Sequence, residues 1–125
     1  MPKRDLIVRL EDIRLSIEQL TNFAESFESE DAYDQSLIHK LAFERIFQVI
    51  GEALFQIKKD FPEIEITDAA KIIGLRHVLA HDYFKVNHHM LWMSIKNDIP
   101  GLKKEIILLI DKENLRLFGT QQPEQ

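Results

Sequence analysis

The spacing of apolar residues constrains this chain more than any other feature, because a three- and four-residue period runs through two long segments. This period places apolar side chains on one face of an α-helix. In residues 5–28 these positions are Leu6, Leu10, Ile13, Ile17, Leu20, Ala24 and Phe27. Residues 33–59 carry two such stripes: Ile38, Ala42, Ile46, Val49, Ala53 and Ile57, and beside them Phe43, Phe47, Ile50 and Leu54. A helix that is apolar over so wide an arc lies at the centre of a bundle or partly under another subunit.

Polar residues mark the starts of the predicted helices. The acidic stretch 28–34 connects the first two helices, and Asp31 is a suitable N-cap for the second. Thr67 or Asp68 caps a third helix over about residues 68–81. These caps predict helices joined by short connections, as in an antiparallel bundle.

Three interruptions break the helical pattern. Gly51 lies within the second helix, where Gly costs roughly 1 kcal/mol relative to Ala and often marks the close approach of another backbone. Residues 82–86 have no helical period and predict a turn, after which Asn87 caps a fourth helix. Residues 98–101 interrupt that helix, and a fifth restarts there and runs to about Leu115 or Leu117.

Length and composition limit the architecture to one helical domain. A chain of 125 residues fits one domain, and four Gly and four Pro are too few for the many turns of a sheet protein. We therefore predict an all-α fold, an antiparallel bundle of four to five helices. The domain covers residues 1–118, and residues 119–125 form a flexible tail.

The charge is distributed unevenly along the chain. The net charge of −5 argues against a nucleic-acid partner. Residues 1–70, however, hold eight basic and fifteen acidic residues, whereas residues 71–104 hold six basic and two acidic residues and four of the five His. A polyanion such as RNA is attracted to that second stretch. A chance fluctuation in a solvated surface explains the same distribution equally well.

The composition also indicates the compartment. The chain has no Cys, which excludes disulfides, thiolate metal sites and a Cys nucleophile and fits a reducing cytoplasm. The first thirty residues carry charges throughout, so no apolar signal-peptide region is present. The longest apolar runs, such as residues 106–110, are too short to span a bilayer. We therefore expect a cytoplasmic protein without a membrane partner.

Several common catalytic patterns are missing. The sequence has no glycine-rich phosphate loop, and no Glu lies three residues before any His, as the di-iron bundles require. His77 and His81 are four residues apart and can ligate one metal from a single helix face. The catalytic Glu of the zinc-protease motif is absent between them. We therefore expect no metal and no cofactor in the reaction.

The remaining candidate is the pattern Arg76-x4-His81-x-Tyr83. On a continuous helix Arg76 and His81 are about 140° apart, so they converge on one phosphate only if the helix ends near Ala80. The His can transfer protons at neutral pH, and the Arg can bind phosphate oxygens and stabilise the charge of the transition state. This pair suits phosphodiester cleavage by the 2′-hydroxyl of RNA. Alternatively, His81 caps the end of the helix and Tyr83 is a half-buried core residue.

With these residues the chain resembles the HepT toxins of the HEPN superfamily, small helical ribonucleases of toxin–antitoxin pairs. Residues 44–53 look like the central helix of that family, and residues 73–84 look like its R-x4-H-x-Y motif. Trp92 and residues 98–102 look like its closing helix region. The residue after the motif Arg is usually Asn in this family and is His77 here, which implies a retained polar role, an altered substrate preference or lost activity.

The resemblance implies a homodimer in which two motifs meet in a cleft and supply two histidines to one site. It implies that Arg76 stabilises the scissile phosphate and that His81 transfers protons, with His77 and Lys85 as auxiliary substrate-binding residues. It also implies that Tyr83 is adenylylated by a nucleotidyltransferase antitoxin of the MNT type, in a type VII-like pair. The added charge and bulk then block RNA.

Two other interpretations remain. The chain is a non-catalytic helical module that binds nucleotide or protein and partners a nucleotidyltransferase, or it is a purely structural bundle. Only the ribonuclease needs His81 for RNA cleavage. In the structural bundle, Arg76 and His81 are buried or paired within the subunit and lie far from any cleft.

Overall fold

The computed structural model describes residues 3–81 and 86–119, which form six helices and no strand within these ranges. The helices are α1 (Lys3–Glu25), α2 (Glu30–Asp34), α3 (Leu37–Asp60), α4 (Ala69–His81), α5 (His88–Asn97) and α6 (Ile99–Phe118). The predicted all-α bundle is confirmed. The additional element is the short α2, which forms inside the acidic stretch that we expected to be a plain connection.

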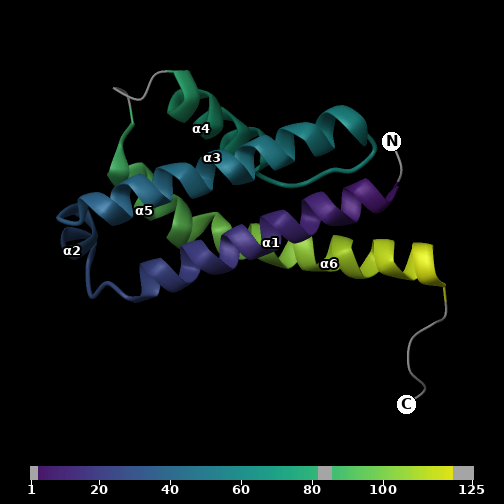
Figure 1. The fold of residues 1–125 in the computed structure, drawn as a ribbon, viewed down its shortest axis with the longest axis horizontal. Coiled ribbons are helices and arrows are strands. Elements are labelled where there is room, and N and C mark those ends of the chain that lie inside the picture. The colour runs from purple at the N-terminus through teal and green to yellow at the C-terminus, as the bar shows by residue number, and fades with distance from the viewer. Residues whose placement is uncertain (1–2, 82–85, 120–125) are drawn as a thin grey trace, which may run out of the picture.

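The long helices α1, α3 and α6 form the body of the molecule. In Figure 1, α1 lies between α3 and α6 and runs antiparallel to both. α5 crosses next to α1 and α6, and α4 packs mainly against α3. The apolar face of α1 supplies side chains that are fully buried, namely Leu6, Leu10, Ile13, Ile17 and Leu20. None of the helices in the described ranges is both long and apolar enough to cross a membrane.

One of the predicted helix caps is confirmed, and another is misplaced. The Asn87 side chain accepts a hydrogen bond from the backbone N–H of Met90 and begins α5, as predicted. The predicted N-cap Asp31 instead lies inside α2, and Ser36 caps α3 by accepting a hydrogen bond from the N–H of His39. The second long helix therefore begins four residues later than position 33, because Ser36 has the extended backbone that a cap requires.

One of the two predicted apolar stripes of α3 is covered within one chain. Phe43, Phe47, Ile50 and Leu54 are all buried in the core cluster. This stripe therefore needs no second subunit to cover it. The large apolar side chains that α3 leaves exposed are at other positions: Leu37, Ile38, Leu41 and Phe55.

The contact between α3 and α4 depends on Gly51. A Cβ atom at this position would lie 2.5 Å from the Cβ of Arg76 and 3.0 Å from the backbone oxygen of Ile72. No real side chain fits in that space, so the absence of a Cβ allows the two backbones to approach. The close approach that the sequence indicated is confirmed, and it fixes where Arg76 of α4 packs against α3.

The start of α5 is attached to α2 and α3 by two histidines. His88 Nε2 lies 2.7 Å from Glu44 Oε2, and His89 Nδ1 lies 2.6 Å from Glu30 Oε2. Beneath them Tyr33 is buried and stacks on the rings of Phe43 and Trp92. Burial raises the pKa of Tyr33 well above its usual range. These contacts fix the point at which the chain re-enters the bundle after the motif segment.

Candidate active site

Two side chains of α3, those of Glu52 and Phe55, hold Arg76 in place. Its Nη1 donates a hydrogen bond of 2.7 Å to Glu52 Oε2, and its guanidinium lies 4.7 Å from the centre of the Phe55 ring. The side chain is only 20% exposed, and its Nε is buried without a hydrogen-bond partner in the described part of the chain. The guanidinium is therefore preorganised, and one of its donors is still unsatisfied.

Glu52 is the residue that sequence reasoning missed. Hydrogen bonds from Gln56 and Arg76 lower the pKa of its carboxyl group, so it is ionised at neutral pH. The signal available in the sequence was its place next to Gly51, since the close approach there brings α4 to this part of α3. That signal indicates the part of α3 that α4 contacts, but it does not identify Glu52 as the partner of Arg76.

The His77 and His81 rings lie together on α4. The two residues are one turn apart, their ring centroids are 4.9 Å apart, and both are exposed. Neither ring makes a hydrogen bond or an ion pair with residues 3–81 or 86–119. Within these residues, no polar contact occupies either imidazole.

The condition for convergence within one chain is not met. We expected Arg76 and His81 to meet if the helix ended near Ala80, but α4 continues through His81. Five residues of continuous helix place Arg76 and His81 about 140° apart around the axis. Accordingly, the guanidinium of Arg76 points to α3, whereas His81 contacts His77. One subunit presents the two groups on different sides of α4.

The purely structural interpretation fits only half of the motif. It expects both motif residues to be buried or paired, and Arg76 is indeed paired with Glu52. His81, in contrast, is exposed and lies in the last turn of α4. Such a histidine can exchange protons with a bound substrate. Tyr83 and Lys85, the predicted modification and auxiliary sites, lie outside the described residues.

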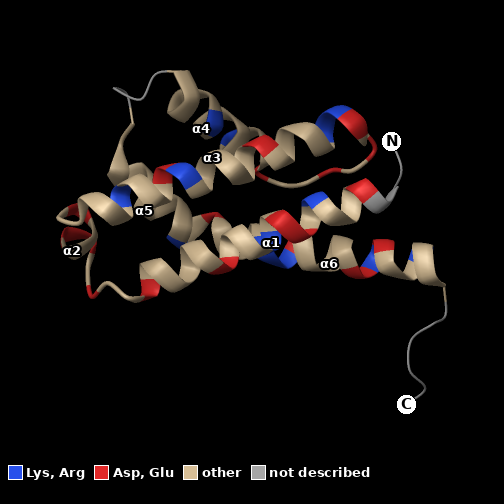
Figure 2. Ribbon diagram, in the orientation of Figure 1, with Lys and Arg blue, Asp and Glu red and all other residues tan. Residues whose placement is uncertain are grey.

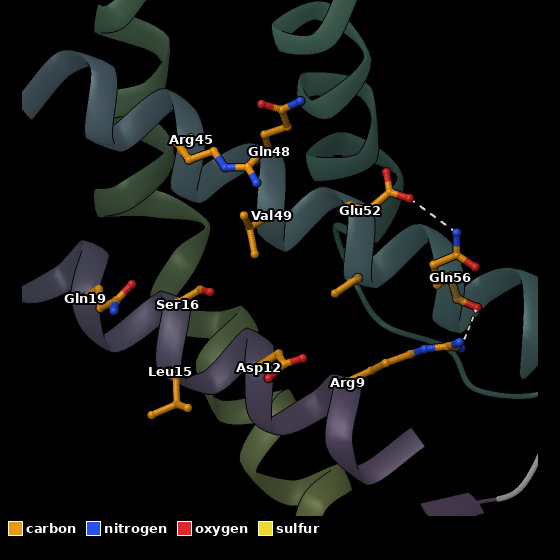
Figure 3. A pocket seen from close by; sticks show the side chains of 11 residues that line it. Arg9, Asp12, Leu15, Ser16, Gln19, Arg45, Gln48, Val49, Glu52 and Gln56 are labelled. Carbon is orange, nitrogen blue, oxygen red and sulfur yellow. Dashed lines mark hydrogen bonds between the residues drawn. The ribbon is translucent and has the colours of Figure 1, made fainter. Parts of the chain in front are cut away.

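A groove between α1 and α3 lies next to the Arg76 contact. Its volume is about 630 Å³, and Figure 3 shows polar side chains of both helices lining it. The lining residues of α3 include Arg45, Gln48, Glu52 and Gln56. Arg45 is exposed and makes no ion pair with the described residues. Glu52 therefore belongs both to this groove and to the Arg76 contact.

The basic stretch does not form one free positive surface. Figure 2 shows basic residues and no acidic residue on α4. Both of these basic side chains are nevertheless paired: Arg76 with Glu52, and Lys71 with Asp98 at 2.8 Å. The pairing with Asp98 raises the pKa of Lys71. The other basic residues that are described in this stretch lie on α5 and α6. The positive charge near the site is thus local and mostly compensated.

No cluster of three or more potential metal ligands occurs among the residues that the structure describes. Within these residues, the chemically active groups of α4 are therefore the guanidinium of Arg76 and the two imidazoles.

Comparison with known proteins assigns the family. A family model described as "Ribonuclease HepT-like" matches residues 13–109, from α1 to α6. The chain is 37% identical over 114 residues to "Putative RNase MJ1216" of Methanocaldococcus jannaschii, which covers 88% of this chain and 91% of that protein. It is 38% identical over 101 residues to "Probable ribonuclease HepT" of Thermococcus cleftensis. That alignment covers 75% of this chain and 86% of that protein. No solved structure matches significantly. The chain belongs to the HepT-like ribonuclease family.

Proposed function

We propose that this protein is a metal-independent endoribonuclease and that Arg76 and His81 perform the cleavage. The observation that carries the proposal is the state of the two motif residues in a chain of this family. Arg76 is held in place by Glu52, and His81 is exposed and unpaired within the described residues. A fixed phosphate ligand and a free proton-transfer group are the two parts that the reaction needs.

The reaction uses the 2′-hydroxyl of the RNA as its nucleophile. One imidazole accepts the proton of that hydroxyl while the 2′-oxygen forms a bond to phosphorus. The bond from phosphorus to the 5′-oxygen breaks, and an imidazolium donates a proton to the leaving oxygen. Arg76 stabilises the negative charge that develops on the phosphoryl oxygens. The products are a 2′,3′-cyclic phosphate and a 5′-hydroxyl end.

The reaction needs a base and an acid, and we propose that a homodimer supplies both. Each chain contributes one His81, and Arg76 and His81 diverge on their own helix. A second α4 placed across the exposed His77 and His81 face brings the His81 of one subunit close to the other motif. The packing of α4, which is mainly against α3, leaves that face available.

We propose that the protein acts as a toxin whose partner is a nucleotidyltransferase antitoxin of the MNT type. Tyr83 follows His81 by two residues, so a modification there adds phosphate charge beside the proton-transfer group. Adenylylation of Tyr83 then repels RNA and blocks the cleft. This part of the proposal rests on the sequence motif and on family membership.

A non-catalytic role is the second candidate. The pairing of Arg76 with Glu52 favours it, because a neutralised guanidinium binds a phosphate less strongly than a free one. In this case the motif holds a nucleotide or a nucleotidyltransferase and cuts nothing.

RNA cleavage in EDTA tests the proposal and separates the two candidates. Purified, unmodified wild-type protein is compared with His81→Ala, and the product ends are analysed. We expect cyclic phosphate ends from the wild type and a loss of at least roughly 100-fold in rate for His81→Ala. Circular dichroism checks that the variant is folded. If clean wild-type protein leaves total RNA intact, the non-catalytic role replaces the ribonuclease.

A further inference from the structure

We propose that His77 and His81 together bind a divalent transition-metal ion of the Zn²⁺ type and that this ion inhibits the ribonuclease. The binding site depends on α4 alone. The inhibition rests on the function proposed above. The ion is thus an inhibitor of the protein and takes no part in the reaction.

The geometry of the two rings suits one shared ion. Both histidines lie on the same face of α4, and their centroids are 4.9 Å apart with ring planes at 52°. Two imidazole nitrogens that each lie about 2.1 Å from one Zn²⁺, at a near-tetrahedral angle, place the ring centroids roughly 5 Å apart. The separation of the two rings is therefore the one that a shared ion requires.

The surroundings leave the ligand atoms free and permit a positive charge. Both rings are exposed, and an ion that binds them breaks no hydrogen bond to a described residue. The two nearest fixed cations on the same helix, Lys71 and Arg76, are each neutralised by a carboxylate. An added ion therefore meets less repulsion than the charge of the segment suggests.

The number of ligands determines how the site behaves. No third His, Cys, Asp or Glu joins the pair among the residues that the structure describes. Water must fill the remaining coordination positions in one subunit, so the ion exchanges readily. The metal series should follow ligand preference: Cu²⁺ binds more tightly than Ni²⁺ or Zn²⁺, and Mg²⁺ and Ca²⁺, which prefer oxygen, do not bind.

Occupation of the site removes the catalytic property of His81. The lone pair that accepts the proton of the 2′-hydroxyl is the one that binds the metal, so a metal-bound His81 cannot act as a base. His77 is the second ligand that makes this inhibition effective, because one exposed imidazole holds such an ion poorly.

Direct binding tests the site without reference to activity. Full-length protein without a histidine tag is titrated with ZnCl₂ by calorimetry, and the histidine signals are followed by NMR. We expect the His77→Asn and the His81→Asn variants each to bind Zn²⁺ roughly tenfold or more weakly than the wild type. His89→Asn removes an exposed histidine of α5 and serves as the matched control, with unchanged binding. Equal Zn²⁺ affinity in all four proteins would overturn the site.

Inhibition is tested in the cleavage assay with added Zn²⁺, with Mg²⁺ as the control ion. We expect Zn²⁺ to stop wild-type cleavage at the concentrations that saturate binding, and EDTA to restore it. The His77→Asn variant, measured against its own zinc-free rate, should need roughly tenfold more Zn²⁺. Saturated binding with an unchanged cleavage rate overturns the inhibition. Absence of cleavage in the zinc-free wild type overturns the proposed function instead, and the titrations still decide the site.

Discussion

α1 and α4 are both essential parts of this fold, but different interactions hold them in place. α1 buries an entire apolar face and contacts α3, α5 and α6. α4 buries one residue fully, Ile72, and leaves Gly74, His77 and His81 exposed. Burial of apolar surface fixes α1, whereas α4 depends on close backbone contact at Gly51 and on the polar and aromatic contacts of Arg76. Of these two helices, α4, which carries the proposed site residues, is the one with fewer buried side chains.

Truncation of one leucine in each helix should produce the largest effect. Leu10→Ala in α1 removes a fully buried side chain and should lower the free energy of unfolding by about 2–5 kcal/mol. Leu75→Ala in α4 removes a partly buried side chain and should cost about 1 kcal/mol. Urea denaturation followed by circular dichroism measures both. Equal losses of unfolding free energy in the two variants would show that core packing holds α4 as firmly as it holds α1.

The two glycines near the α3–α4 contact should give effects of opposite sign. Gly51→Ala forces a methyl group against Arg76 and the backbone of α4, so we expect a loss of about 1–3 kcal/mol in stability and a lower cleavage rate. Gly74→Ala meets no atom within 4 Å and should stabilise the helix by up to about 1 kcal/mol. Thermal unfolding of the two variants compares them directly. A stabilising Gly51→Ala would mean that the two backbones can separate at little cost.

Removal of the Glu52 charge should have the smallest effect on stability of these substitutions, but a clear effect on the cleavage rate. Glu52 is half exposed, so Glu52→Gln should alter the free energy of unfolding by less than about 1 kcal/mol. Because Arg76 loses its fixed position, cleavage should slow roughly 10- to 100-fold. The matched control is Glu18→Gln, which breaks a similar surface pair with Arg14 on α1 and should leave cleavage unchanged. Equal rates for both variants would remove Glu52 from its positioning role.

The pH dependence of the same pair adds a second readout. The pKa of Glu52 is lower in the folded protein than in the unfolded chain. The stabilisation that Glu52 contributes to the folded state is therefore fully present above the unfolded pKa of about 4.3. It is lost as the pH falls through the pKa of the folded state. The difference in unfolding free energy between the wild type and Glu52→Gln should vanish in strong acid. A difference in unfolding free energy that grows as the pH falls would contradict this prediction.

The sequence predicted the parts of the fold that depend on local pattern. The apolar period of α1 identifies its buried face, and Asn87 and Gly51 mark a cap and a close approach correctly. Each of these signals is a property of one residue or one helix. The prediction for the acidic stretch 28–34 was wrong, because Ser29 and Asp31 are equally suitable N-cap residues and only the final packing selects between them.

The geometry of the site could not be predicted in the same way. The partner of Arg76 lies 24 positions away on another helix, and no local rule names Glu52. The end of α4 at His81 agrees with the predicted range of 68–81, so the condition for convergence, an end near Ala80, is not met. Long-range pairs depend on how neighbouring helices pack, and their residue types occur everywhere on a charged surface.

The tight packing at Gly51 means that Arg76 has two separable halves. Its Cβ and Cγ form the hydrocarbon wedge against the Gly51 backbone, and its guanidinium carries the charge. Truncation to Ala removes the wedge together with the charge, whereas Met keeps an unbranched stem and removes only the charge. The difference in cleavage rate between the Ala and Met variants measures how much of the effect of removing Arg76 comes from lost packing between α3 and α4.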